Sequence, residues 1–386
     1  MRKKLSGICK FYSGTGFPLK YQGKTHGKLP FYKVGDITNN VMQGNTNLKL
    51  CNNYISDVEA EEIGGTIIPP NTVVFAKIGE ALRLNRRAIT TVKCLIDNNV
   101  MGIAPIESEV SLKYLYYFMC NLKMELLAES TTVPSVRKSK LEELEIDLPD
   151  LQEQHNIEKI LDGASALIQL RKIQLEQYEK LIKSRFVEMF GDITLNPFKW
   201  KKECLQSHID MITGYPFDSN KYSIEGIKIC GGLIIMPNCI KWEECKYWES
   251  GDGYEQFFLD ADDIVLALDR PWISEGLKIG MVHSSDLPAL LIQRTARIRG
   301  KDMEQKFLLY LLKDEAFKRQ CTVTGSLVPH ISNKDINNYE VIVPPLELQR
   351  RFATFVGQVE KLKVTAKKSL RETQKFFDSL VQSYFG

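Results

Sequence analysis

Two long segments of the chain place hydrophobic residues at every seventh position, which is the spacing of a helix that packs along another helix. In the segment 151–190, which contains no proline, the repeating positions are held by Leu161, Ile168, Leu175, Ile182 and Met189. Near the end of the chain they are held by Val356, Leu370, Phe377 and Tyr384, and Lys363 interrupts the row. Each segment predicts one continuous helix, and forty helical residues span about 60 Å.

The start of the first helix carries a signal of its own. Asp150 and Glu153 have the spacing of a capping box, in which two side chains satisfy free amide groups at the start of a helix. Because a globular segment lies between the two helices, we expect their hydrophobic seams to pair in an antiparallel arrangement. An ordinary helical bundle with attached domains is the alternative.

The chain also repeats itself over a long distance. Residues 132–154 return at 327–349 with a constant offset of 195, so that Pro134 corresponds to Pro329 and Gln154 to Gln349. The match continues to the ends of both helices, where Phe190 corresponds to Phe385. Weaker matches upstream have offsets of 198 and 191, which indicates insertions within two related globular domains.

Each globular domain is predicted to mix short strands with short helices. The fold class is therefore α+β, with two mixed α/β globular domains joined by two long antiparallel coiled-coil helices in a pseudo-twofold internal repeat. Strands are expected at Thr72–Phe75, Ile146–Leu148, Ile264–Leu266 and Val341–Val343, and a helix near Leu112–Phe118. The predicted segments are 1–149 and 193–344 for the domains, and 150–192 and 345–386 for the helices.

Composition restricts the class of protein without indicating its ligand. The 386 residues are 44% hydrophobic, which is enough for buried cores, and the formal net charge is only +3. This charge does not by itself indicate a nucleic-acid surface. The nine cysteines and five histidines show no metal-ligand spacing, so we expect no metal site and no disulfide scaffold. No apolar run approaches the roughly 20 residues that cross a bilayer, so we expect no membrane partner and a cytoplasmic location.

Side chains that can hydrogen-bond to base edges gather in the loops of both domains. Arginine can bind guanine through two hydrogen bonds, and asparagine or glutamine can do the same for adenine. The candidates in the first domain are Lys77, Arg83, Arg86, Arg87, Asn98 and Asn99, and those in the second are Arg270, Trp272, Gln293 and Arg294. For any single arginine, the alternative is a solvated surface charge.

The loops around the repeated prolines add polar side chains at matching places. We add these residues to the candidates for binding DNA, because both copies of the repeat place hydrogen-bond donors next to the repeated proline. They are Thr131, Ser135, Arg137 and Lys138 in the first copy, and Ser326, His330, Asn333 and Lys334 in the second.

The sequence contains no recognisable catalytic centre. Asn196-Pro197-Phe198 lacks the second proline of an amino-methyltransferase motif, and Gly14-Thr15-Gly16 lacks the third glycine of a nucleotide-binding loop. The acidic group Asp260, Asp262 and Asp263 precedes an apolar strand and is more typical of a turn than of a metal site. We therefore expect a protein without catalytic residues.

Several of these features occur together in one known protein family. Two variable domains each end in a Val-Pro loop, followed by a Pro-x-Leu-x-x-Gln helix start at Pro149–Gln154 and Pro344–Gln349. The first helix ends at Phe190-Gly191-Asp192, and the second copy stops at Gly386. In these respects nearly the whole chain resembles the specificity (S) subunit of type I restriction–modification systems.

The resemblance implies a set of partners. Each globular domain would be a target recognition domain that reads one half of a split, asymmetric sequence in double-stranded DNA. The paired helices would fix the spacing of the two halves and hold two methyltransferase (M) subunits, which use S-adenosylmethionine. Two restriction (R) subunits would add ATP- and Mg-dependent translocation and cleavage, and this chain itself would carry no cofactor. The alternatives are a DNA adenine methyltransferase in its own right and a coiled-coil scaffold that binds only proteins.

Overall fold

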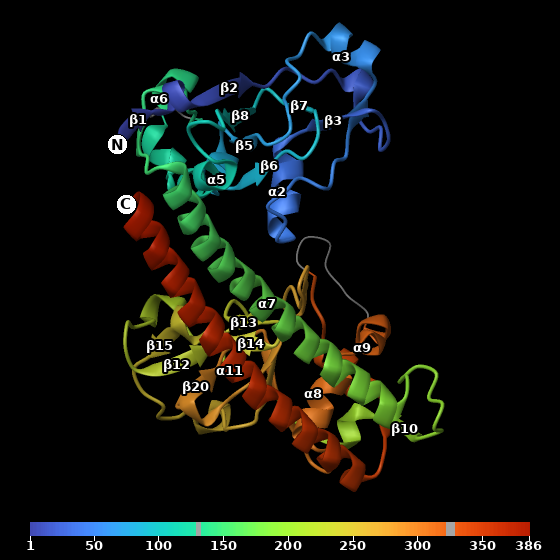
Figure 1. The fold of residues 1–386 in the computed structure, drawn as a ribbon. Helices are drawn as coiled ribbons and strands as arrows, with labels where there is room; N and C mark the ends of the chain where they lie inside the picture. Colours follow the sequence, from blue (N-terminus) through green and yellow to red (C-terminus); the bar gives the residue numbers. More distant parts are fainter. Residues whose placement is uncertain (129–132, 322–328) are drawn as a thin grey trace. The chain divides into compact units, whose positions relative to one another are not determined.

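The computed structural model describes residues 1–128, 133–321 and 329–386. The chain forms two compact units, each drawn in Figure 1. Unit 1 contains Met1–Gln174 together with Ala366–Gly386, and unit 2 contains Leu175–Thr365. The two longest helices, α7 (Leu151–Phe190) and α11 (Leu346–Phe385), each contribute to both units. The four segments predicted from the sequence separate the helices from the domains, whereas this division cuts through both long helices. The predicted segment boundaries therefore remain a prediction.

Unit 1 is built on two small sheets. The first is antiparallel with the order β2-β8-β5-β6, and the second has the order β4-β3-β7, in which β3 and β7 are parallel. A further pair joins β1 to β9. The strands are β1 (Arg2–Lys4), β2 (Cys9–Ser13), β3 (Leu29–Tyr32), β4 (Tyr54–Ile55), β5 (Val73–Ala76), β6 (Arg87–Ile89), β7 (Leu95–Ile96), β8 (Val100–Pro105) and β9 (Glu145–Asp147). The helices are α1 (Leu5–Ile8), α2 (Val34–Met42), α3 (Asp57–Ile63), α4 (Glu80–Arg83), α5 (Leu112–Asn121) and α6 (Lys138–Glu142).

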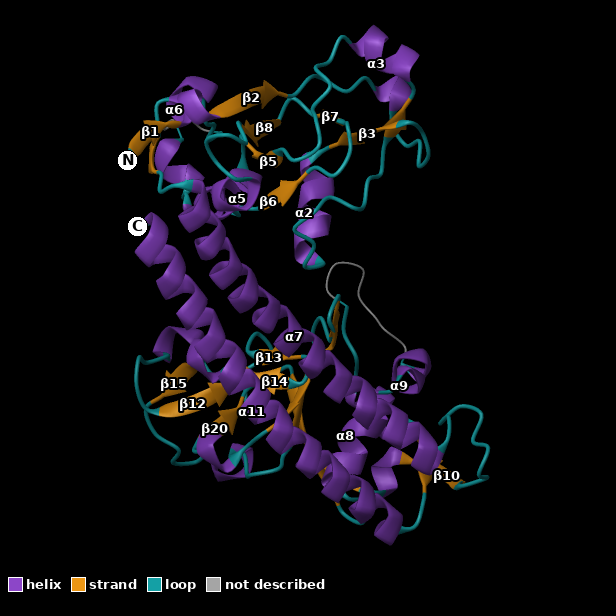
Figure 2. Cartoon of the chain, in the orientation of Figure 1, coloured by secondary structure: helices purple, strands orange, loops and turns teal. Residues whose placement is uncertain are grey.

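Unit 2 repeats this plan of strand orders, and Figure 2 shows its helices in purple and its strands in orange. Its sheets have the orders β11-β21-β16-β19 and β15-β12-β20, with β12 and β20 parallel, and β10 pairs with β22. The strands of these sheets are β10 (Lys201–Cys204), β11 (Ile209–Thr213), β12 (Ile227–Cys230), β15 (Lys246–Trp248), β16 (Ile264–Ala267), β19 (Ile279–Met281), β20 (Ala289–Leu291), β21 (Thr295–Gly300) and β22 (Glu340–Val343). Two short hairpins are β13 (Ile235–Met236) with β14 (Cys239–Ile240), and β17 (Trp272–Ile273) with β18 (Gly276–Leu277). The remaining helices are α8 (Gln305–Lys313), α9 (Glu315–Gln320) and α10 (Asn333–Asn337).

The structural repeat explains the change between the sequence offsets of 191 and 195. Strands β5 and β16 occupy the same place in their sheets and begin at Val73 and Ile264, an offset of 191. Strands β8 and β21 begin at Val100 and Thr295, which restores the offset of 195. The chain therefore gains four residues between these strands in unit 2, and the repeat stays in register from there on. The predicted internal repeat and α+β class are confirmed.

The central strands are apolar along their whole length because both faces of the sheet are covered. All four residues of β5 and all four of β16 are buried. In unit 1 one face packs on α5 and the other on α2, where Val74 meets Ile37 in a separate cluster. A strand buried on both faces shows no alternation of apolar and polar residues, which is why these segments read as β-branched runs.

Within each unit a segment of α7 packs against a segment of α11. In unit 2, Phe186 and Phe190 contact Phe352 with ring centres 5.4 and 5.5 Å apart, and Lys363 pairs with Glu179. The later residues of α7 contact the earlier residues of α11, so the two segments are antiparallel. In unit 1, Ile157 and Leu161 share a core with residues near the end of α11.

Burial along the helices follows the predicted rows only in part. Leu161, Ile168, Ile182 and Val356 are buried, whereas Leu175, Met189, Leu370, Phe377 and Tyr384 are partly exposed. The fully buried residue near the end of α7 is Phe190, one position beyond the predicted Met189. A straight helix has 3.6 residues per turn, so its buried face drifts away from a strict seven-residue repeat.

A glutamine near the start of each long helix ties that helix to the globular part of its unit. Gln154 accepts a hydrogen bond from the Ser111 amide (2.9 Å) and donates to the carbonyls of Glu109 (3.1 Å) and Pro149 (2.9 Å). This contact gives a physical role to the glutamine of the Pro-x-Leu-x-x-Gln motif.

Gln349 makes the same contact in unit 2. It accepts from the Glu304 amide (2.9 Å) and donates to the Pro344 carbonyl (2.8 Å). We call the contacts of Gln154 and Gln349 the glutamine joints. Both side chains are almost fully buried, so these hydrogen bonds form away from water.

Candidate nucleic-acid interface

Three segments far apart in sequence meet at one end of the sheet in unit 2. They are residues 268–270 after β16, the turn at 292–294 between β20 and β21, and residues 329–331. Main-chain hydrogen bonds fix them: Leu268 N donates to Arg294 O (2.9 Å), Arg270 N to Pro329 O (2.7 Å) and Ile331 N to Leu268 O (3.0 Å). We call these three segments the loop cluster of unit 2. It gathers four of the predicted residues, namely Arg270, Gln293, Arg294 and His330.

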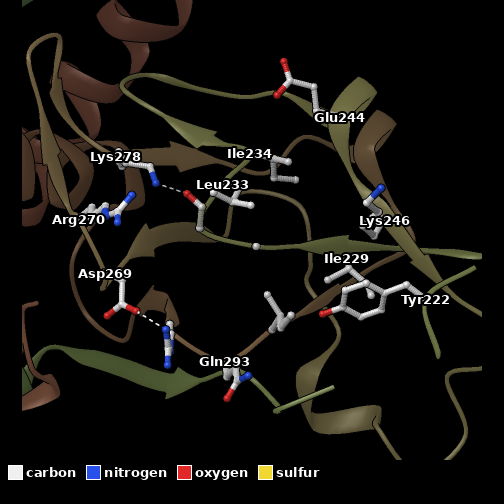
Figure 3. Close-up of a pocket in the computed structure, with 14 residues that line it drawn as sticks. Tyr222, Ile229, Leu233, Ile234, Glu244, Lys246, Asp269, Arg270, Lys278 and Gln293 are labelled. Carbon is white, nitrogen blue, oxygen red and sulfur yellow. Dashed lines mark hydrogen bonds and ion pairs between the residues drawn. The ribbon is translucent and has the colours of Figure 1, made fainter. Parts of the chain in front are cut away.

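A cavity of about 590 Å³ opens beside this cluster. Figure 3 shows Arg270, Asp269 and Lys278 on one side of it, and Tyr222, Lys246 and Glu244 on the other. Four cationic side chains and two carboxylates line the cavity, so its charged groups sum to a positive value. Ile229, Leu233, Ile234 and Ile292 add apolar surface. A cavity of this kind offers both hydrogen-bond donors and a surface for flat or methyl-bearing groups.

Asp269 organises the polar side of the cavity. Its Oδ2 lies 3.0 Å from Nη1 of Arg294, and its Oδ1 lies 2.7 Å from Nδ1 of His330. The Asp269 side chain is 25% exposed, whereas the Arg294 side chain is 71% exposed. The carboxylate therefore anchors one edge of the guanidinium while the remaining N–H groups face solvent.

Lys278 lies deeper in the same cavity. Its Nζ donates to the carbonyl of Gly232, and little of the residue is exposed. Burial lowers the pKa of Lys278 from its usual value, and the nearby Arg270 lowers that pKa further. The buried lysine thus bonds to the backbone at the base of the cavity, while Arg270 and Arg294 offer hydrogen-bond donors at its rim.

Unit 1 has an equivalent loop cluster with the same main-chain hydrogen bonds. Lys77 N donates to Asn99 O (2.9 Å), Gly79 N to Pro134 O (2.8 Å) and Val136 N to Lys77 O (2.9 Å). Asn98, Asn99 and Ser135 therefore take the places of Gln293, Arg294 and His330.

Two further positions differ in chemical type between the clusters. Gly79 takes the place of Arg270, and Ile78 takes that of Asp269, as the bridges Ile78–Ser135 and Asp269–His330 show. The three main-chain hydrogen bonds are the same in both units, but the side chains at the linked positions differ.

The other predicted residues of unit 1 lie in several environments. Arg83 is exposed and pairs with Glu80 at 3.2 Å, while Lys77 and Arg86 are partly buried. Arg137 and Lys138 are exposed at the start of α6. We keep these five in the candidate set.

Arg87 requires a correction. Its guanidinium is buried and donates to the carbonyls of Met119 (3.1 Å), Arg86 (3.0 Å) and Leu122 (3.4 Å) and to Oδ1 of Asn85 (2.6 Å). Burial lowers the pKa of Arg87 to about 10. The hydrogen bonds of this guanidinium are made inside the protein, so the side chain cannot reach a base. We therefore remove Arg87 from the candidate set.

The remaining predicted residues of unit 2 flank the loop cluster. Asn333 and Lys334 are exposed in the first turn of α10, at the place that α6 holds in unit 1. Trp272 is partly buried against the core, with its ring centre 6.2 Å from that of Phe317. Thr131 and Ser326 lie outside the described residues.

Four charged residues that line the cavity were not among the sequence candidates, namely Asp269, Lys278, Glu244 and Lys246. Asp269 precedes the candidate Arg270, and an acid beside a predicted arginine is a signal that could have found it. Lys278 gave no signal, because only the folded chain brings it to the cavity. Over the described ranges, no group of three or more His, Cys, Asp and Glu side chains could hold a metal ion. A search of the same ranges finds no helix long and apolar enough to span a membrane.

Comparison with known proteins places the chain in a family. A family model described as "Type I restriction modification DNA specificity domain" matches residues 1–179 and 214–373. Among curated proteins, the chain is 29% identical over 283 residues to the type I restriction enzyme MjaVIII specificity subunit of Methanocaldococcus jannaschii, covering 68% of this chain and 66% of that protein. It is 23% identical over 413 residues to the MjaIX specificity subunit of the same organism, covering 98% of this chain and 91% of the relative.

Other relatives are matched over a shorter part of their length. The chain is 28% identical over 206 residues to the EcoAI specificity subunit of Escherichia coli, which covers 51% of this chain and 34% of that protein. The chain thus spans about a third of the EcoAI subunit and slightly less than two thirds of the MjaVIII subunit.

Solved structures show the same fold. The S subunit of a type I restriction–modification system from M. genitalium matches with a TM-score of 0.55 at 16% identity, covering 100% of this chain and 96% of that one. A chain from a study of complex assembly and conformational transition in a type I R-M system matches with a TM-score of 0.56 at 17% identity, covering 100% and 97%. Because the family model covers most of both repeats, the protein belongs to the family of type I restriction–modification DNA specificity domains.

Proposed function

We propose that this chain is the non-catalytic specificity subunit of a type I restriction–modification complex and reads a split, asymmetric sequence in double-stranded DNA. Its relatives are named specificity subunits, which favours this function over a methyltransferase or a protein-only scaffold. The observation that carries the proposal is the pair of equivalent loop clusters. One framework presents Asn98, Asn99 and Ser135 in unit 1, and Gln293, Arg294 and His330 in unit 2.

This pattern suits a reader of two different sequences. Sequence is read by hydrogen bonds to base edges, and each well-formed pair of hydrogen bonds contributes about 1–3 kcal/mol of discrimination. Two clusters with different donors would select different bases, so the two half-sites would differ. The set proposed to contact DNA contains Lys77, Arg83, Arg86, Asn98, Asn99, Ser135, Arg137, Lys138, Arg270, Trp272, Gln293, Arg294, His330, Asn333 and Lys334.

The proposed partners are those that the resemblance to specificity subunits implies. Two M subunits would bring S-adenosylmethionine, and two R subunits would bring the ATP- and Mg-dependent steps. In unit 1 one side of α7 leaves Ile160, Leu167 and Leu170 about half exposed, and their helical spacing aligns them on a face other than the one packed against the core. An apolar stripe of this kind supports docking of a protein on α7.

Genome-wide mapping of methylated adenine tests the proposal. The chain is expressed with the M subunits of its own system, in cells that lack other adenine methylation. We expect methylation at a split sequence, and its loss when this chain is omitted. Methylation that persists without the chain, or that follows no sequence, would contradict the proposal.

A domain exchange sharpens the same test. Replacing residues 1–130 with the matching part of a relative should change one half of the methylated sequence and leave the other half unchanged. A change in both halves would show that the two units do not read independently. An equivalent exchange of residues 214–326 serves as the matched control and should change only the other half.

A binding measurement addresses the alternatives. The net charge of +3 supplies little attraction to phosphates, so we expect the isolated chain to bind DNA weakly even at low salt. Nanomolar affinity without M subunits would contradict this expectation. Binding of S-adenosylmethionine by the isolated chain would favour the methyltransferase alternative.

A further inference from the structure

Two arginines of the loop cluster in unit 2 adopt a backbone conformation that arginine normally avoids. Arg270 has φ 45° and Arg294 has φ 63°, both in the left-handed region. That region costs an L-residue about 1–2 kcal/mol, and glycine is the usual occupant. In unit 1 the position of Arg270 is held by Gly79, with φ 74°. Unit 2 therefore keeps side chains where glycine would be more stable, which indicates that these side chains have a use.

Arg294 is the better oriented of the two. It lies on the turn between β20 and β21, and its Nη1 is held 3.0 Å from Oδ2 of Asp269. Asp269 is fixed in turn by its contact with Nδ1 of His330 and by a β-bridge between the two residues. One edge of the guanidinium is thus anchored, and its other donors are free to meet a ligand as a rigid planar group.

The anchored geometry selects a ligand with two adjacent acceptors in one plane. In the major groove, guanine offers such a pair, O6 and N7. Adenine pairs the N7 acceptor with an N6 donor, which a guanidinium cannot satisfy because it has no acceptor. A phosphate is a weaker match, because Asp269 offsets the charge of Arg294 and would repel an anion.

We propose that Arg294 reads a guanine in the half-site of unit 2, and that Asp269 is the positioning residue that orients it. The inference rests on the proposed function. This anchored contact belongs to unit 2 alone, because unit 1 has Asn99 and Ile78 at the corresponding positions and so lacks both the arginine and the carboxylate.

The test uses the assembled complex of full-length chain and M subunits, with methylated adenine mapped genome-wide. The wild type should show a guanine at a fixed position in one half of its split sequence. Arg294→Gly should relax that position alone, with a loss of roughly 5- to 150-fold in preference for guanine. Glycine tolerates φ 63°, so this variant should fold as well as the wild type, which tryptophan fluorescence during urea unfolding will check.

Two conservative variants separate base reading from phosphate binding. Arg294→Lys keeps the charge but loses the planar pair of donors, so guanine preference should fall nearly as far as in Arg294→Gly. Asp269→Asn keeps the shape and removes the negative charge, so preference should fall in part while overall DNA affinity stays equal or rises. The matched control is Arg319→Ala, an exposed arginine of unit 2 on α9, which should change neither.

Several outcomes would overturn the inference. They are guanine preference retained in Arg294→Lys, methylation in Arg294→Gly that is uniformly weaker but occurs at the unchanged sequence, or relaxation at an A·T pair. In each of these cases the split sequence itself survives, so the proposed function stands. If no split sequence depends on this chain, the proposed function fails and this inference fails with it.

Discussion

The glutamine joints and the loop clusters are two regions that both units share, and they differ in how closely the two copies agree. At the joints, Gln154 and Gln349 accept from an amide at the start of α5 or α8 and donate to the carbonyl of the proline five residues earlier. At the loop clusters the main-chain hydrogen bonds agree, but Gly79 and Asn99 are replaced by Arg270 and Arg294. The repeat has kept the contacts that hold each long helix to the start of α5 or α8 and has changed the side chains of the loop clusters. Stability is therefore best tested at positions that agree, and specificity at positions that differ.

The largest effect on stability is expected where corresponding residues differ in burial. Phe190 is fully buried among Phe186, Phe307 and Phe352, whereas the corresponding Phe385 is partly exposed. Phe190→Ala should lower the free energy of unfolding by about 3–5 kcal/mol, and Phe385→Ala by less than half of that. All four tryptophans lie in unit 2, so their fluorescence during urea unfolding measures the effect of Phe190→Ala, whereas hydrogen exchange of peptides from β8 measures the effect of Phe385→Ala in unit 1. Equal losses in the two variants would show that the helix ends are packed alike.

Each unit also holds a poorly solvated cation, and the two should respond oppositely to replacement. Arg87 in unit 1 satisfies three carbonyls, so Arg87→Met should lower the free energy of unfolding by about 2–3 kcal/mol. Lys313 in unit 2 has its pKa lowered by burial to about 8, and its Nζ lies 4.2 Å from the ring centre of Tyr310. Lys313→Met should therefore stabilise unit 2 near pH 7.

The sign of the pH dependence distinguishes this explanation for Lys313 from a simple gain in packing. Between pH 8 and the ordinary lysine pKa of 10.5, the unfolded chain binds a proton that the folded chain does not bind. The stability of the wild type should rise relative to Lys313→Met through that window, so the difference between the two should be largest near pH 7 and shrink toward pH 10. Urea unfolding at several pH values measures it. A constant difference would indicate that packing alone is responsible.

The joints themselves should give smaller and equal effects. Gln154→Ala and Gln349→Ala each leave a buried amide and a proline carbonyl without a partner, which should cost about 1–2 kcal/mol. Hydrogen exchange of peptides from β8 and β21 reports the loss in each unit separately. Gln152→Ala, an exposed neighbour on α7, is the control and should have little effect. A clear loss of protection from hydrogen exchange in only one of the two variants would show that the two joints are not equivalent.

The smallest effect concerns the strained turn of the loop clusters. Arg270→Gly relieves a left-handed arginine, so the stability of unit 2 should stay unchanged or rise by about 0.5 kcal/mol. Gly79→Ala places a side chain at φ 74° and should lower the stability of unit 1 by about 1 kcal/mol. Thermal unfolding followed by circular dichroism measures both changes. A marked loss in Arg270→Gly would mean that this side chain supports the fold.

The repeat and the long helices could be predicted from sequence because both depend on regular spacing. A constant offset and a seven-residue period survive without knowledge of any contact. The burial of Phe190 in place of Met189 could not be predicted, because helical drift over forty residues decides it. The role of Gln154 was equally hidden, since its partner Ser111 lies 43 residues away.

The candidate site was predicted only in outline. The residue types in the loops indicated base-edge donors, but Arg87 showed no sign that its hydrogen bonds would be satisfied by the protein interior. The cavity depends on Asp269, which reaches Arg294, and on Lys278, which reaches Arg270, only after β16, β19 and β21 have paired. Long-range pairing decides which donors remain available, and no local pattern encodes it.

Unit 1 is assembled from two stretches of chain that lie on either side of unit 2 in the sequence. A ribosome adds roughly 5–20 residues per second, so about 10–40 s pass between the synthesis of Gln174 and that of Ala366. Throughout that interval the apolar surface that awaits Phe377 and Phe385 stays uncovered on the nascent chain. A premature stop codon before Ala366 should therefore destabilise unit 1 as well as truncate unit 2. Chaperones that bind during translation should bind mainly to residues 1–174, whose apolar surface waits for the end of α11.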